Sequence, residues 1–280
     1  METLFEHPHL LDSALGRAAA YLASAILFGL AIWEYWLKTP IIYQRYYRWC
    51  ALFLGLFGLL IAINSTVLEV SNPFNADDMG LPELATVFEL LQNTNFGKAW
   101  LSYTALLFFA VFSKKLSFRG LALAGMLGAL VFSSHAGEEG LLRVAFWVDY
   151  FHLLFALSWL GGLTVLIALR LSKKLVIEVD GLQFFSRMAL PVFILILASG
   201  MMQIILRIVQ EERLNSGYIT VLGIKLILVV AIILSAWGLR RHLKRNNLNA
   251  AAFDNGLSLE FFFAMVLILV TGLLTQIAPG

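Results

Sequence analysis

Long apolar runs separated by short polar segments make up most of this sequence. A helix that crosses a bilayer needs about 20 mostly apolar residues, and eight stretches approach or exceed that length: residues 14–37, 48–70, 97–113, 118–135, 144–170, 186–209, 218–240 and 256–277. The runs are continuous, whereas the strands of a membrane β-barrel alternate apolar and polar residues. The pattern therefore predicts an all-α, polytopic membrane helix bundle with eight transmembrane helices.

The connection at residues 71–96 is longer than the others. It begins with turn-forming residues, and Pro82 suits the first turn of a helix. Four apolar residues that follow fall on one helical face, namely Leu84, Val87, Phe88 and Leu91. We expect a short amphipathic helix at the outer interface of the bilayer, with an ordinary capping loop as the alternative.

The composition favours a membrane protein as well. Of the 280 residues, 60% are hydrophobic and only 14% are charged, and the mean hydropathy is +0.82, whereas about a quarter of a soluble domain is charged. So few charged groups cannot coat a soluble surface, which excludes a soluble enzyme, a disordered chain and a nucleic-acid-binding protein. Cys50 is the only cysteine, so no intrachain disulfide can form.

The placement of the charges predicts the orientation in the membrane. Basic residues favour cytoplasmic loops, and fourteen of the 20 Lys and Arg residues lie in or beside the odd-numbered connections: Lys38, Arg45, Arg48, Lys114, Lys115, Arg119, Arg170, Lys173, Lys174, Arg187, Arg240, Arg241, Lys244 and Arg245. Most acidic residues lie on the opposite side. We therefore expect both termini on the outer side (N-out and C-out).

Short similarities between distant segments indicate an internal repeat. Gly29 sits late in the first stretch as Gly161 and Gly162 do in the fifth, and Arg48 opens the second stretch as Arg187 opens the sixth. We expect one integral membrane domain, 1–280, built of two parallel four-helix halves, 1–140 and 141–280. Chance similarity among apolar helices is the alternative. The glycines of the fifth stretch would also allow close helix contact.

Ionisable residues inside membrane helices are costly, and they are therefore candidates for function. Asp149 and His152 are three residues apart and share one face of the fifth helix, where the carboxylate could orient the imidazole as it does in metal sites. The alternative is a pair satisfied within the bundle. More candidate ligands lie on the same outer side: His7, His9, His135 and Glu138. Such a cluster suits Cu(II), Zn(II) or Ni(II), and a solvated tail and loop is the alternative.

Other residues in the outer half of the bundle add to this picture. Met201 or Met202 could ligate Cu(I), because thioethers suit that ion, although membrane methionines usually serve packing. Lys225 in the seventh stretch is a further buried charge, which could pair with Asp149 or with Glu69.

Several motifs occur in a set order along the chain: Thr94-x-Phe96-Gly97-x-x-Trp100, Ser134-His135-Ala136-Gly137-Glu138, Asp149-Tyr150-Phe151-His152, Trp159-Leu160-Gly161-Gly162, Phe185-Ser186-Arg187-Met188-Ala189, Tyr218 followed by Lys225, and Glu260. In these motifs the chain resembles the copper resistance protein D (CopD) family over essentially its whole length, although Ile219 stands where the family usually has Gly. Family members are multi-pass proteins of the bacterial inner (cytoplasmic) membrane linked to copper uptake or tolerance. The resemblance implies copper, as Cu(I) or Cu(II), and a separate periplasmic copper carrier (CopC-like) as partner.

We expect a copper permease that takes copper at the outer His/carboxylate site and moves it inward through the lipid bilayer. No nucleotide-binding motif occurs that would indicate ATP-driven pumping, and we expect neither an enzyme nor a nucleic-acid partner. Two alternatives remain. One is a b-type haem redox protein, since membrane histidines can ligate haem. The other is a sensor or loading factor that binds copper without transport.

Overall fold

The computed structural model describes residues 9–35, 44–71, 84–134, 140–171, 179–210, 214–244 and 250–277. Within these ranges the chain forms nine helices: α1 (Leu10–Tyr35), α2 (Gln44–Ser71), α3 (Leu84–Asn93), α4 (Asn95–Phe112), α5 (Leu116–Phe132), α7 (Val144–Leu171), α8 (Val179–Gln210), α9 (Ser216–Lys244) and α10 (Ala250–Leu274). The described residues contain no strand. The predicted all-α fold class is confirmed.

Each of the eight predicted stretches coincides with one helix. Six of these helices, α1, α2, α7, α8, α9 and α10, are long and apolar enough to cross a membrane. The remaining pair, α4 and α5, is shorter, at 18 and 17 residues. The chain is therefore a multi-pass membrane protein, and the number of eight crossings stays a prediction.

Some helices begin well before the apolar stretch that predicted them. Helix α8 begins at Val179, where we predicted residue 186, and α10 begins at Ala250, where we predicted residue 256. Hydropathy detects only the apolar part of a helix, whereas the backbone hydrogen bonds continue through polar turns that reach beyond the hydrocarbon.

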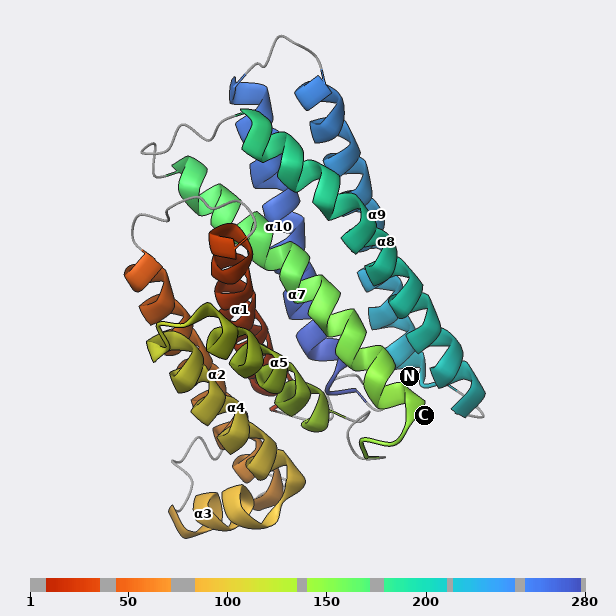
Figure 1. Ribbon diagram of the computed structural model, residues 1–280. Helices are drawn as coiled ribbons and strands as arrows, with labels where there is room; N and C mark the ends of the chain where they lie inside the picture. The colour runs from red at the N-terminus through yellow and green to blue at the C-terminus, as the bar shows by residue number, and fades with distance from the viewer. Residues whose placement is uncertain are drawn as a thin grey trace.

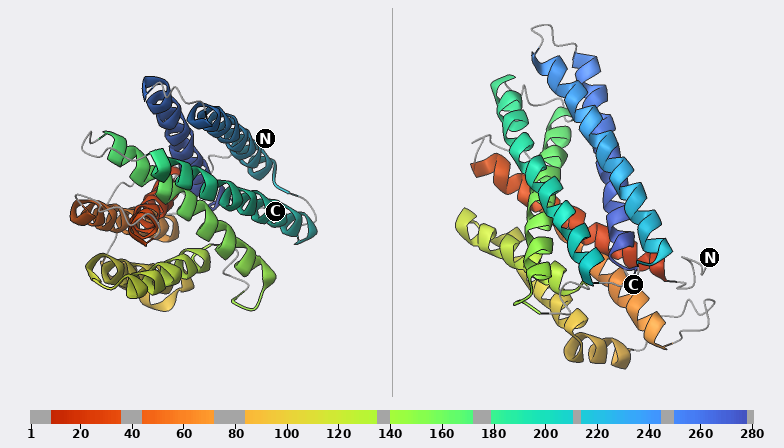
Figure 2. Two further views of the ribbon diagram at one scale, coloured as in Figure 1. Left: turned by 45° about the horizontal axis from the view of Figure 1, so that its top comes forward. Right: turned by 90° about the vertical axis from the view of Figure 1, so that its right-hand side faces the viewer.

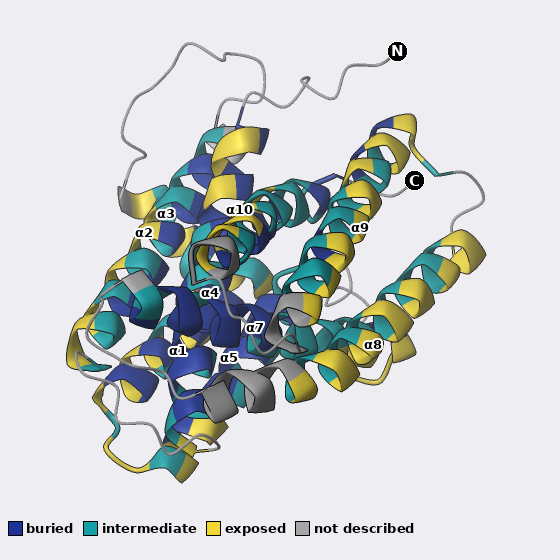
Figure 3. Ribbon diagram, turned by 90° about the horizontal axis from the view of Figure 1, so that it is seen from above, coloured by how far each residue is buried: buried dark blue, intermediate teal, exposed yellow. Residues whose placement is uncertain are grey.

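Helix α1 lies at the centre of the bundle (Figures 1 and 2). It packs against α2, α7 and α10, and small residues such as Ala20, Ala23 and Ala25 are fully buried along it. Helix α8 packs on α7, and α9 packs on α10. Figure 3 shows the buried residues gathered around α1, with exposed residues along α8 and α9. Those outer faces carry apolar side chains such as Val209 and Ile227, which suit contact with lipid.

The first and last helices meet at one end of the bundle. Leu10 of α1 belongs to one apolar cluster with Leu274 and Ile277, which end the described chain. The two ends of the described chain therefore lie at the same end of the molecule (Figure 1). This arrangement agrees with an even number of crossings; the orientation in the membrane stays a prediction.

Glycines bring α1 and α7 into backbone contact. A Cβ atom on Gly29 would lie 2.1 Å from the carbonyl oxygen of Gly161, and one on Gly161 would lie 2.1 Å from that of Ala25. Trp33 then donates a hydrogen bond of 3.1 Å from Nε1 to the carbonyl of Gly162. The close contact expected from the glycines of the fifth stretch is confirmed, and its partner is the similar segment of the first stretch.

Helix α3 falls inside the long connection where we expect an interfacial helix, although residues 72–83 lie outside the described ranges. Leu90 is buried against Ile63 and Val67 of α2, with Val87 packed beside it. Phe88 is 61% exposed and does not belong to this cluster. Whether α3 lies at the membrane interface stays a prediction.

A buried ion pair joins α1 to α5. Arg119 donates a hydrogen bond of 2.8 Å from Nη2 to Oε1 of Glu34, and its Nη1 lies 2.8 Å from Oε2. Gln44 donates a further hydrogen bond of 2.5 Å to this carboxylate. We placed Arg119 in a basic loop, and that placement is wrong: it lies in the first turn of α5 and is 4% exposed.

We expect Glu34→Ala to lower the free energy of unfolding by about 2 to 3 kcal/mol, because it leaves the Arg119 cation buried without its carboxylate. This expected loss of free energy is smaller than for a fully buried ion pair, since the Glu34 side chain is 38% exposed. Thermal unfolding in detergent measures the loss. Asp254→Ala, which breaks the more exposed pair with Arg170, is the matched control and should cost below about 1 kcal/mol. Equal losses in both variants would contradict the prediction.

Candidate functional site

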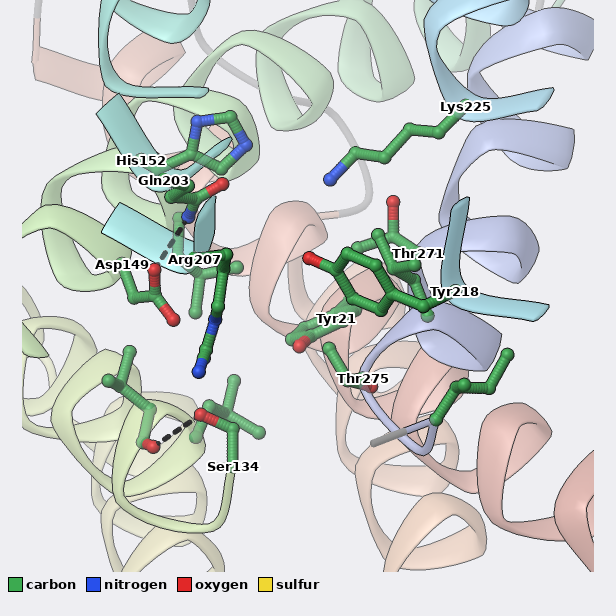
Figure 4. Close-up of a pocket in the computed structure, with 15 residues that line it drawn as sticks. Tyr21, Ser134, Asp149, His152, Gln203, Arg207, Tyr218, Lys225, Thr271 and Thr275 are labelled. Carbon is green, nitrogen blue, oxygen red and sulfur yellow. Dashed lines mark hydrogen bonds between the residues drawn. The ribbon is translucent and has the colours of Figure 1, made fainter. Parts of the chain in front are cut away.

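A cavity of about 120 Å³ lies among α1, α7, α8, α9, α10 and the end of α5. It is close to the end of the bundle where the described chain starts and finishes, because Leu274 and Ile277 form part of its wall. The polar and charged side chains that line it are labelled in Figure 4. They come from six helices or helix ends far apart in sequence, and Asp149 and His152 are among them.

Ser199 of α8 orients the imidazole of His152. Its Oγ lies 3.0 Å from Nδ1 of His152 and 2.6 Å from the carbonyl oxygen of Leu195. A serine hydroxyl has one proton, and here it is donated to the Leu195 carbonyl. Ser199 therefore accepts a hydrogen bond from Nδ1–H, and we assign the bare lone pair to Nε2. A neutral imidazole with a bare nitrogen is the form that ligates a metal ion.

Gly200 makes room for this imidazole on α8. A Cβ atom at this position would lie 3.2 Å from Cε1 of His152, which is tighter than ordinary van der Waals contact. The absence of a side chain lets α8 approach α7 where His152 projects. Helix α8 therefore borders the ring of His152 through both Ser199 and Gly200.

Asp149 has a partner other than the expected one. Gln203 donates a hydrogen bond of 2.9 Å from Nε2 to Oδ1 of Asp149, one turn along α8 from Ser199. In the structure, Ser199 orients the imidazole, and this is the role that we expected of Asp149. The carboxylate keeps acceptor capacity toward the cavity, because a carboxylate offers about four lone-pair positions.

Two cations share the cavity with Asp149. Arg207 of α8 and Lys225 of α9 both line it, and both interact electrostatically with the carboxylate. Of the two partners considered for Lys225, Asp149 lies in the same cavity, and the side chain of Glu69 lies outside the described residues. The sequence interpretation missed Arg207, although it falls within the stretch 186–209 and the rule for intramembrane charges applies to it.

Arg17 fixes the wall that α5 contributes, and sequence interpretation missed it too. This side chain is 2% exposed. Its Nη1 donates to the carbonyl of Leu130 at 2.8 Å and to Oγ of Ser133 at 2.7 Å, and its Nη2 donates to the Ser133 carbonyl. A cation at a helix C-terminus is stabilised by the helix dipole. Arg17 also interacts with Tyr21, whose side chain lines the cavity.

The two methionine candidates lie away from the cavity. Met201 is 59% exposed and Met202 is 39% exposed, and neither lines the cavity. Ser199, Gly200 and Gln203 lie on the face of α8 that is directed toward α7. Met201 is rotated about the helix axis by about 100° or more from each of these positions. The structure therefore does not bring either methionine to His152.

The other predicted ligands are placed only in part. His7, His135 and Glu138 lie outside the described residues, although Ser134, which directly precedes His135, lines the cavity. His9 is 7% exposed, and its Nδ1 lies 3.8 Å from Oδ2 of Asp12. The described ranges contain no group of three or more His, Cys, Asp or Glu side chains that could hold a metal ion.

The fold and the cavity define a multi-pass membrane protein with a charged, histidine-bearing site inside its helix bundle. Residues 180–274 match the family model for copper resistance protein D, and residues 13–144 match the model for the N-terminal domain of copper resistance protein D-like proteins. The chain belongs to the copper resistance protein D family and is a membrane protein related to copper resistance. No curated protein and no solved structure gives a significant match.

Proposed function

We propose that the protein moves copper across the bacterial inner membrane and takes it up at the cavity on the outer side. The observation that carries this proposal is the cavity itself, where His152 and Asp149 of α7 lie together inside a membrane bundle. The imidazole offers Nε2 and the carboxylate offers oxygen, and both atom types ligate copper. Family membership supplies the link to copper.

The proposal includes the remaining predictions about this site and its surroundings. We propose eight crossings with both termini outside, so that the cavity faces the periplasm. His135 and Glu138 would complete the ligand set, because Ser134 at the end of α5 already reaches the cavity. His7 and His9 would collect copper, and a separate periplasmic carrier would deliver it. No enzymatic step is involved.

A flux measurement tests the proposal. Purified protein in liposomes that enclose a copper-sensitive dye should admit copper faster than protein-free liposomes of the same lipid. Copper binding without flux would overturn transport and favour the sensor or loading factor. Both outcomes are distinguishable, because metal analysis of the same preparation reports binding separately.

The haem alternative receives less support from the cavity. Its volume of about 120 Å³ is smaller than the roughly 300–1,000 Å³ of pockets that hold drug-sized ligands, and haem is of that size or larger. His152 is the one histidine of the described residues that lines it, so bis-His ligation would need a residue outside those ranges. A Soret band in the visible spectrum of the purified protein would overturn this conclusion.

A further inference from the structure

Among the residues that the structure describes, the charges that line the cavity do not balance. Arg207 and Lys225 contribute two positive charges and Asp149 contributes one negative charge, which leaves an excess of one positive charge with His152 neutral. Both cations interact electrostatically with Asp149, so the described carboxylate is shared between them. A bare copper ion would raise the positive charge of the cavity further, which is unfavourable where the dielectric constant is low.

The surroundings of Lys225 provide hydrogen-bond donors. Lys225 has no hydrogen bond or ion pair to any other described residue, and the same holds for the side-chain hydroxyls of Tyr218 and Thr271. Figure 4 shows the ammonium group of Lys225 and the hydroxyl of Tyr218 pointing into the cavity. Thr271 lies beside them on α10. All three side chains are partly buried, and a charge within a membrane bundle favours a partner.

Helix geometry brings these three donors together. Tyr218 and Lys225 are seven residues apart on α9, which is two turns, so they lie on one face. Thr271 lies on α10, which packs against α9. The cavity volume of about 120 Å³ is several times the roughly 10–15 Å³ that one water molecule needs. Its size fits a small ion, and its charge and donors select a negative one.

We propose that Lys225, Tyr218 and Thr271 form a binding site for a small monovalent anion, such as chloride or formate, beside the copper site. Resting on the proposed function, the inference adds that copper enters the cavity together with this anion. The anion offsets the charge of Lys225, and its other lone pairs are available to the metal ion. The binding of the anion alone does not depend on copper.

The test uses the metal-free protein in detergent. A ligand that binds the folded state raises the melting temperature with its concentration, so chloride and formate should raise Tm above that in isethionate, a larger sulfonate, at equal ionic strength. Equilibrium dialysis with labelled chloride should show about one bound ion per chain. No difference between chloride and isethionate in the wild-type protein would overturn the inference.

Two variants and a control locate the site. Lys225→Gln should weaken chloride binding on the order of tenfold or more, because the charge within contact distance is lost. Thr271→Val keeps the side-chain shape and should weaken it by a smaller factor, which covers the case that Lys225→Gln fails to fold. Lys98→Gln removes the same charge from an exposed position of α4 and should leave binding unchanged. Equal chloride binding in Lys225→Gln and wild type would place the anion elsewhere and overturn the inference.

Copper flux distinguishes failure of this inference from failure of the proposed function. Copper flux without chloride binding would retain the transporter and reject the anion site. Chloride binding without copper flux would retain the anion site and reject transport.

Discussion

Copper flux into proteoliposomes should fall on the order of tenfold or more in His152→Ala, because the change removes the imidazole nitrogen that the cavity offers to the metal. Replacement of groups that only orient a metal-binding histidine already costs about 10- to 100-fold in affinity or activity. The flux assay measures the loss directly, and metal analysis of the same protein shows whether bound copper is lost in parallel.

A second variant separates ligation from orientation. Ser199→Ala keeps the imidazole but removes the hydroxyl that accepts its Nδ1–H at 3.0 Å. We expect copper binding to weaken by about tenfold while the folded protein is retained. Thr164→Val on α7, the helix that carries His152, is the control: its hydroxyl donates to the carbonyl of Leu160, and it does not line the cavity. Wild-type flux in His152→Ala with normal expression would contradict the site.

Gly161→Ala should destabilise the bundle strongly, although it adds one methyl group. The new Cβ would lie 2.1 Å from the carbonyl oxygen of Ala25 and 2.6 Å from the nitrogen of Gly29. Both are backbone atoms of α1, so no side chain can rotate away and the two helices must separate. Overpacking of a core costs about 1–3 kcal/mol and occasionally more, and we expect the upper part of that range. Thermal unfolding in detergent measures it.

A glycine without neighbours provides the control for this effect. A Cβ on Gly238 of α9 meets no atom within 4 Å, so Gly238→Ala should leave stability equal or raise it by about 0.4–1 kcal/mol, because alanine reduces the freedom of the unfolded chain. The two substitutions should therefore have opposite signs. A decrease in Tm of the same size in both would show that the contact between α1 and α7 does not limit helix packing.

The sequence by itself determined the fold class and the helix positions. An uninterrupted apolar run has one low-energy form in lipid, because every backbone group must find its hydrogen bond within the segment. Each predicted stretch therefore coincides with a helix. It also identified Asp149, His152 and Lys225, since an ionisable residue among apolar ones stands out without any knowledge of its neighbours. Arg17 and Arg207 could have been found by the same rule.

Only the tertiary structure decided which of these groups meet. The periodicity of α8 is weak because most of its positions are apolar, so the sequence could not show that Ser199 and Gln203 face α7 while Met201 faces outward. Likewise, the burial of Arg119 could not be read from the sequence, because burial depends on the neighbouring helix and not on the residue type. Helices far apart in sequence, from α1 to α10, close the cavity. Local residue patterns fix a helix, but the pairing of helix faces follows from packing between segments that the chain order does not relate.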